Sequence, residues 1–227
     1  MPPTRRRGAR PATGRAHSGA TAADGRPLPP GGVGAPVPVA LEQVGPLLQA
    51  AARRAAAPDG RGDGPAAVVW REGADALVVL LDRIGVRTTD GGVLVIVPVA
   101  CDQLPDLRGS VVVSFAVGSP ARPAGLVAAA GAIPQGPDVV VGRWGEALTA
   151  LAWQALLDVV AGVAGASGRD LDGSPLVPAS MTATDQGLTV LPQARHPFDR
   201  LTTTSAVAAP AGGSPADALL RTAVRSR

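Results

Sequence analysis

The sequence contains no lysine, asparagine or tyrosine, and it is poor in the groups that carry enzyme chemistry. Its one cysteine, Cys101, excludes an intramolecular disulfide and a metal site built from several cysteines. Its two histidines, His17 and His196, do not form a recognisable zinc-binding set with the scattered aspartates. The sequence also lacks a phosphate-binding P-loop, a dinucleotide fingerprint and a G-x-S-x-G nucleophile motif. We therefore expect no cofactor and no bound metal.

Charge is distributed unevenly along the chain. All 21 basic residues are arginine, a bias typical of a GC-rich genome, so the high isoelectric point is weak evidence about function. Residues 1–64 carry 9 arginines against 4 acids, residues 65–200 carry 9 against 13, and residues 201–227 carry 3 against 1. The central part is therefore mildly acidic, and the excess of basic charge lies towards the two ends.

Composition divides the chain into four parts. Residues 1–37 form an arm rich in arginine, proline and glycine; they cannot bury enough apolar surface to offset the entropy of ordering, so we predict disorder. Residues 38–65 hold a short helical pattern, interrupted by a Gly-Pro pair, and then a linker. Residues 66–199 are predicted to form a single α+β domain, and residues 200–227 a flexible tail.

The strongest secondary-structure signal is a helix over Trp144–Val163. Its core-facing stripe consists of Trp144, Leu148, Leu151, Ala152, Ala155, Val159 and Val163. The helix would be roughly 30 Å long, which also suits a membrane span. However, Asp158 would cost about 2.5–3.5 kcal/mol near the bilayer centre, and Gln154 adds to that cost. We therefore expect a soluble core helix and no membrane association.

Apolar runs predict several strands around this helix. Val86–Thr89 and Val93–Val99 are predicted to form a hairpin. Every residue from Val93 to Val97 is apolar, so both faces of that strand are expected to be covered, and Pro98 is expected at an edge or a bulge. The other predicted strands are Ala67–Trp70, Leu77–Leu81 (with a helix as the alternative), Val111–Val117, Asp138–Val141 and Leu188–Leu191.

These elements predict an α+β fold. A mainly antiparallel sheet of about four to six short strands is expected to pack on one long helix in the C-terminal half, with disordered N- and C-terminal tails. The Pro/Gly-rich segment 118–137 is predicted to be a loop with one helical turn near Leu126. The sheet can cover only one side of the long helix, so the other side needs a separate explanation.

That other side is also apolar. Trp153 and Leu157 are four residues apart and project away from the main stripe, with Ala150 and Ala161 beside them. A surface helix normally carries Lys, Glu or Arg at such positions. An apolar surface centred on a tryptophan is common at protein interfaces, so these four residues, here called the ridge, are the predicted partner-binding residues. The alternative is that the loop 118–137 or the N-terminal helix covers the ridge.

Three classes of function follow from these features. The favoured one is a non-catalytic interaction or assembly protein that binds a protein partner, or a second copy of itself, through the ridge. The second is an enzyme of unidentified reaction, with Cys101 and His196 as a weak nucleophile–base pair and Asp102 or Asp199 orienting the base. The third is a nucleic-acid-associated protein that uses its arginine-rich arm, although the arm has no aromatic side chain for base stacking.

Two short motifs carry little functional weight. The run that starts at Asp170 resembles the beginning of a calcium loop, but Pro175 and Met181 stand where glycine and a bidentate glutamate are needed, which indicates an ordinary polar turn. The run Arg5-Arg6-Arg7 is not followed by an apolar segment, so no secretion signal is expected and the cytoplasm is the default location.

Overall fold

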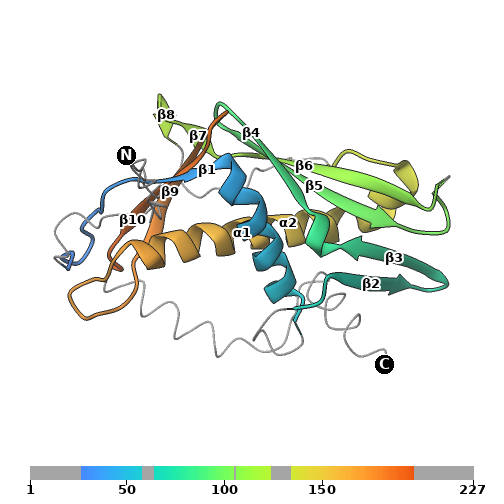
Figure 1. The fold of residues 1–227 in the computed structure, drawn as a ribbon, viewed down its shortest axis with the longest axis horizontal. Helices are drawn as coiled ribbons and strands as arrows, with labels where there is room; N and C mark the ends of the chain where they lie inside the picture. The colour runs from blue at the N-terminus through green and yellow to red at the C-terminus, as the bar shows by residue number, and fades with distance from the viewer. Residues whose placement is uncertain (1–26, 58–63, 105, 124–133, 197–227) are drawn as a thin grey trace, which may run out of the picture.

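Two helices lie beneath two antiparallel sheets in the computed structural model, which describes residues 27–57, 64–104, 106–123 and 134–196. Figure 1 shows the longer helix, α2, running along the molecule, with the shorter α1 crossing it. The predicted α+β class, with antiparallel sheets and one long helix in the C-terminal half, is confirmed. The tail predicted over 200–227 and the helical turn predicted near Leu126 lie outside the described residues.

Helix α2 spans Asp138–Ser167, so it begins six residues earlier and ends four residues later than predicted. The strand predicted over Asp138–Val141 is wrong: those residues form the first turn of the helix. Pro137 precedes this turn in an extended conformation, and Asp138 places a carboxylate at the positive end of the helix dipole. Val140 is fully buried, so tertiary packing outweighs the strand preference of three consecutive valines.

Strand β1 (Val37–Ala40) and helix α1 (Leu41–Ala55) belong to the same core as the rest of the fold. The buried face of α1 consists of Val44, Leu48, Ala51 and Ala52, and it packs on α2. Gln49 Nε2 also donates a 2.9 Å hydrogen bond to the Ile84 carbonyl. The predicted start of the folded unit at residue 66 is therefore corrected.

The predicted interruption of the N-terminal helix is also wrong. The Gly45-Pro46 pair lies inside a continuous α1. A proline within a helix costs about 3 kcal/mol because it removes a backbone hydrogen bond. The fully buried face of α1 offsets that cost, which no local pattern could reveal.

Part of the arm predicted to be disordered also joins the fold. Residues 1–26 lie outside the described residues, but residues 27–37 are described. Leu28 pairs with Asp170, and the Gly34 N–H donates a 2.8 Å hydrogen bond to the Pro192 carbonyl. These backbone contacts attach the segment to the end of the three-stranded sheet.

The larger sheet has five strands. They are β2 (Ala67–Glu72), β3 (Asp75–Leu80), β4 (Gly85–Thr89), β5 (Gly92–Ala100) and β6 (Arg108–Ala116), all paired antiparallel. Leu77–Leu81 is thus mainly a strand, as favoured, and its last residue opens a short 3-10 turn, Leu81–Arg83. The β4–β5 hairpin is confirmed, with a register that pairs Thr89 with Gly92.

Pro98 lies where β5 changes its neighbour. β4 pairs with β5 up to Ile96, and β3 pairs with it only from Val99 onwards. At the level of Pro98, the 3-10 turn connects β3 to β4. Pro98 therefore has a paired strand on one side only, which is β6. A residue without an N–H is tolerated there, in agreement with the expected edge-like position.

The smaller sheet has the strand order β1-β10-β9, with β9 at Val177–Thr184 and β10 at Gly187–Gln193. The two sheets meet where the Gly91 N–H donates a 3.0 Å hydrogen bond to the Ala183 carbonyl. A two-stranded ribbon, β7 (Gly118–Ser119) and β8 (Arg122–Pro123), lies against β9.

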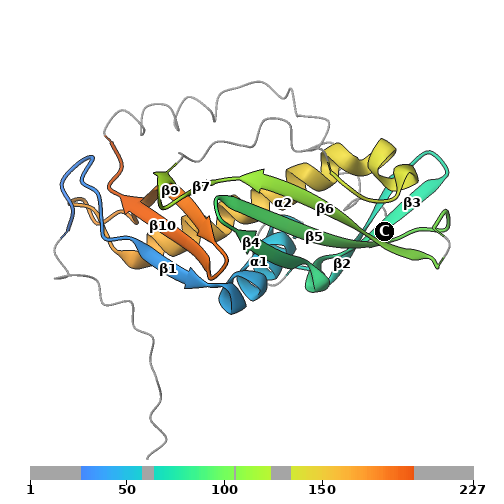
Figure 2. The same ribbon diagram turned by 90° about the horizontal axis from the view of Figure 1, so that it is seen from above.

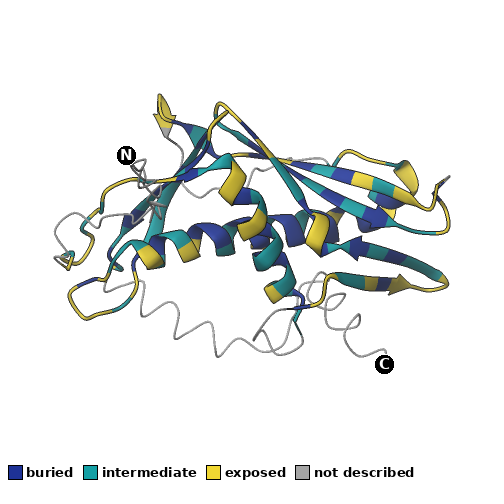
Figure 3. Cartoon of the chain, in the orientation of Figure 1, coloured by how far each residue is buried: buried dark blue, intermediate teal, exposed yellow. Residues whose placement is uncertain are grey.

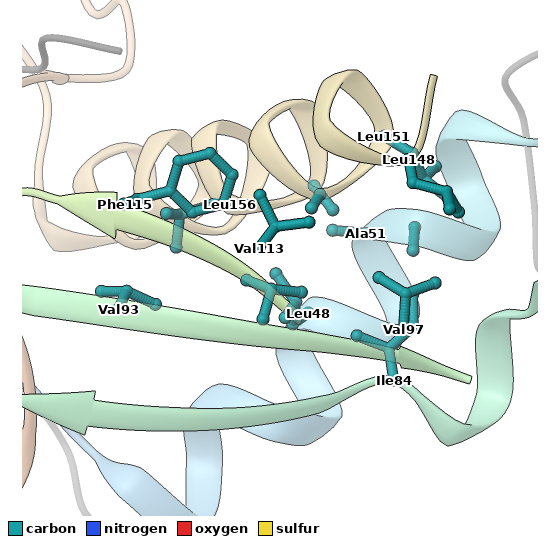
Figure 4. Packing of buried hydrophobic residues seen from close by; sticks show 14 of the residues in the cluster. Leu48, Ala51, Ile84, Val93, Val97, Val113, Phe115, Leu148, Leu151 and Leu156 are labelled. Carbon is teal, nitrogen blue, oxygen red and sulfur yellow. The ribbon is translucent and has the colours of Figure 1, made fainter. Parts of the chain in front are cut away.

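Both helices lie on the same side of β4, β5 and β6, and Figure 2 shows these strands in front of the helices. Figure 3 shows the buried residues concentrated along α2 and along alternate positions of the strands. In Figure 4, side chains of β5 and β6 point towards α1 and α2, with Leu48 and Leu156 between the layers. Val111, Val113, Phe115 and Val117 are all buried, as predicted for one face of β6 and the residue after it.

A buried hydroxyl in this core yields a stability prediction. Thr88 on β4 is 8% exposed, and its Oγ1 has no hydrogen-bond partner among the described residues. Replacing Thr88 with valine keeps the shape and removes a desolvated polar atom, so we expect the free energy of unfolding to rise by about 1 kcal/mol. Chemical denaturation measures this change, and exposed Thr89→Val is the control. A loss of stability in Thr88→Val would show that the hydroxyl is hydrogen-bonded.

Candidate functional site

The candidate site is the side of α2 that is turned away from the core. Buried positions occupy most of the circumference of the helix. They are Val140, Trp144, Gly145, Ala147, Leu148, Leu151, Ala152, Ala155, Leu156, Val159, Val160 and Ala164. They contact α1 and strands of both sheets, so the main stripe is covered by this chain alone.

Trp153, the centre of the predicted ridge, is half-buried and packs against the core. Its ring lies on Phe115 of β6, with the two centroids 5.1 Å apart and the planes tilted by 38°. One side of Trp153 is therefore covered from within the chain. The sequence placed Phe115 on the buried face of its strand but held no signal that would pair it with a helix 38 positions later.

The other three ridge residues lie closer to solvent. Leu157 and Ala150 are half-buried, and Ala161 is exposed. On a helix, positions 150, 153, 157 and 161 follow one another along one face, so the four predicted residues do form one continuous surface. Trp153 is the residue of this surface that packs against the core, and Leu157 is its central aliphatic side chain.

This surface is almost free of charge. After Glu146, the only ionisable residue on α2 is Asp158. Asp158 is half-buried, and it accepts a 2.8 Å hydrogen bond from Gln154 Nε2. Between Glu146 and the end of the helix, the exposed positions are Gln154, Ala161, Gly162 and Ala166. A solvent-facing helix surface with so few charged side chains has the composition of a contact surface rather than of a solvated one.

Charge is instead concentrated at the start of α2, where it serves the fold. Arg143 forms ion pairs with Glu72, at 3.4 Å, and with Asp75. Gln103 Nε2 donates a 2.8 Å hydrogen bond to the same Asp75 carboxylate. Glu72 and Asp75 flank the β2–β3 turn, so these contacts attach that turn to the helix.

The candidate catalytic pair is not brought together. Cys101 follows the end of β5, beside the pairing of Val78 with Ala100 in the five-stranded sheet. His196 follows β10 of the other sheet and lies near Gly31. Figure 1 shows these two places at opposite ends of the long axis. Asp102 is exposed next to Cys101, and Asp199 lies outside the described residues.

The calcium-like run forms a polar turn, as predicted. The Asp170 carboxylate accepts hydrogen bonds from the N–H groups of Asp172, at 3.2 Å, and Ser174, at 2.9 Å. Gly173 adopts a positive φ of 80°, which closes the turn. Within the described ranges, no three histidine, cysteine or acidic side chains are grouped in a way that could hold a metal ion.

By length and composition, α2 is the one helix of the described residues that could cross a membrane. The core helix of a soluble protein has the same properties, and α2 packs against α1 and both sheets. A soluble protein is compatible with this arrangement.

The chain matches no protein-family model, and no curated protein or solved structure is significantly similar to it.

Proposed function

We propose that this protein is a non-catalytic interaction or assembly protein of the cytoplasm, which binds a protein partner or a second copy of itself through the ridge on α2. The observation that supports this proposal is the solvent side of α2 after Glu146, where Asp158 is the one ionisable residue and Ala150, Leu157 and Ala161 remain half-buried or exposed. A partly exposed apolar surface that includes a tryptophan has the composition of an interface hot spot.

The packing of Trp153 on Phe115 fits this proposal. A hot-spot side chain is most effective when it is held in place before the partner arrives, since less conformational entropy is then lost on binding. The ring contact at 5.1 Å packs the indole against Phe115, and in this proposal Leu157 contacts the partner.

The test compares two adjacent leucines. Leu156 is fully buried, whereas Leu157 is half-buried. Leu156→Arg buries an unpaired charge and should leave no folded protein, because such a change costs several kcal/mol. Leu157→Arg should keep the circular-dichroism spectrum and cost at most about 1–2 kcal/mol in stability, since the arginine can reach water.

Association is the decisive measurement. Sedimentation velocity of the full chain reports a second copy, and a photocrosslinking residue at Ala161, used in the native cell, reports a different partner. We expect an oligomer or a discrete adduct that Leu157→Arg abolishes. A chain that is monomeric at all concentrations and forms no adduct contradicts the proposal, as does a Leu157→Arg variant that unfolds like Leu156→Arg.

A further inference from the structure

We call the face of the five-stranded sheet that points away from the helices the outer face. The strand register shows which residues lie on it. Paired residues share a face of a sheet. Val69 pairs with Val78, and Val78 with Ala100, while Ile96 pairs with Val112 and Leu94 with Arg87. The neighbours of these residues in sequence, such as Val79, Val95 and Val111, are buried on the face that packs against the helices. The outer face therefore runs across all five strands.

The outer face is aliphatic where a solvated sheet face would be polar. An antiparallel sheet with one face in water normally alternates buried apolar residues with polar ones. Here the larger outward side chains are mostly aliphatic, and the uncharged polar ones are three exposed hydroxyls, of Thr89, Ser110 and Ser114. The aliphatic outward residues are Val69, Val78, Leu80, Leu94, Ile96 and Val112. Of these six, five are half-buried and Val69 is exposed. The exposed fraction of Val69 is 40%. No helix of the described residues lies on this face (Figures 1 and 2).

The charged side chains on the outer face have one sign. Arg71 pairs with Ala76, Arg87 with Leu94 and Arg108 with Ala100, so all three arginines share the aliphatic face. They are exposed, and none of them forms an ion pair with a described residue. The strands place no aspartate or glutamate among the outward positions. An apolar face with unpaired positive charge is complementary to an acidic, apolar partner.

The positions of the arginines also define the length of that partner. Arg87 lies level with Leu94 on β5, and Arg108 lies level with Ala100. Six residues of strand separate these two levels, which corresponds to about 20 Å. Between them, Ile96 and Val112 supply the aliphatic surface. A segment with carboxylates about 20 Å apart and aliphatic side chains between them would match both features.

We propose that the outer face binds an acidic, aliphatic segment of another protein. The chain's own ends do not supply it, because residues 1–26 carry 6 arginines and 1 aspartate, and residues 197–227 carry 4 arginines and 2 aspartates. Residues 124–133 contain no charged side chain. Pairing with the same face of a second copy would oppose arginine to arginine. The face has no outward aromatic residue for stacking on bases, so a nucleic acid fits less well.

This surface is distinct from the ridge, although both make the molecule a binding protein. The ridge lies on α2, on the helix side of the sheet, whereas the outer face lies on the opposite side of the same sheet. A molecule with two such surfaces would bridge two partners. Failure of one surface in an experiment leaves the other unaffected, so the two proposals can be separated.

The test uses a defined probe, a phage-displayed library of random 16-residue peptides selected on the immobilised full chain. We expect enrichment of peptides with aspartate or glutamate on both sides of an aliphatic stretch. An enriched peptide, made synthetically, should bind the R71Q/R87Q/R108Q variant at least ten-fold more weakly. The matched control, R54Q/R122Q/R169Q, removes the same charge at exposed positions off the sheet and should bind within two-fold of the natural chain. Leu157→Arg should also bind within two-fold.

Several outcomes overturn the proposal. They are a library that gives no enrichment, enriched peptides without carboxylates, and equal binding by the R71Q/R87Q/R108Q variant. Co-sedimentation with phosphatidylserine vesicles that this variant abolishes would assign the face to an anionic membrane instead. An oligomer of the natural chain that Ile96→Glu dissociates would assign it to a second copy.

Discussion

Truncating Leu48 to alanine will destabilise the protein by about 2–5 kcal/mol, the cost of a cavity in a well-packed core. Leu48 is fully buried between α1, the strands and α2 (Figure 4). The effect is large because α1 carries only a few large buried side chains, and Leu48 is the largest of them. Chemical denaturation of the full chain gives the change in the free energy of unfolding.

The adjacent Leu47 provides the control, because it is 40% exposed on the same helix. Leu47→Ala should cost less than about 1 kcal/mol, since alanine has the higher helix propensity and little apolar burial is lost. Equal and small effects at both positions would mean that α1 is not docked and that the folded unit begins after it. The pair therefore decides whether the corrected boundary holds in solution.

The sequence predicts best those elements whose pattern is local. The β4–β5 hairpin carries its own turn, and the register that pairs Thr89 with Gly92 follows from it. The alternation of Val111, Val113 and Phe115 identifies the buried face of β6, because a strand places every second side chain on the same side.

Elements that depend on a distant partner are not predicted. Strand β1 has only four residues and contains Pro38, and strand β9 contains Pro178; a proline within such a run argues against a strand. Both are strands because they pair with β10, the element between them in the sheet. The docking of α1 and the helical first turn of α2 likewise depend on burial against other elements, which overrides local propensity.

The ridge shows the same difference between local patterns, which are predictable, and contacts between distant elements, which are not. Helical spacing correctly groups Ala150, Trp153, Leu157 and Ala161 on one side of the long helix, with exposure that ranges from half-buried to exposed. It could not show that Phe115 supports Trp153, because that contact joins two elements across the fold. The apolar run of β5 similarly predicted two covered faces, but it could not show that the described elements cover only one of them.

The two faces of β5 lead to the prediction with the largest contrast. Val95→Asp places a carboxylate in the core between the sheet and the helices, where Val95 is fully buried. A buried, unpaired charge costs several kcal/mol, which is comparable to the whole stability of a domain of this size. We therefore expect no folded protein, measured as loss of the cooperative thermal transition.

Ile96→Asp introduces the same side chain one residue later, on the outer face. Ile96 is half-buried, so the carboxylate can reach water, and only part of an isoleucine's burial is lost. The expected cost is about 1–2 kcal/mol, including the poor strand propensity of aspartate. The variant should therefore keep a cooperative transition at a lower midpoint. If Ile96→Asp unfolds the protein as completely as Val95→Asp does, the outer face is covered within the folded chain, and the binding surface proposed there does not exist. If the two variants differ as expected, the sheet tolerates charge on the outer face alone, because that face meets solvent in the free molecule.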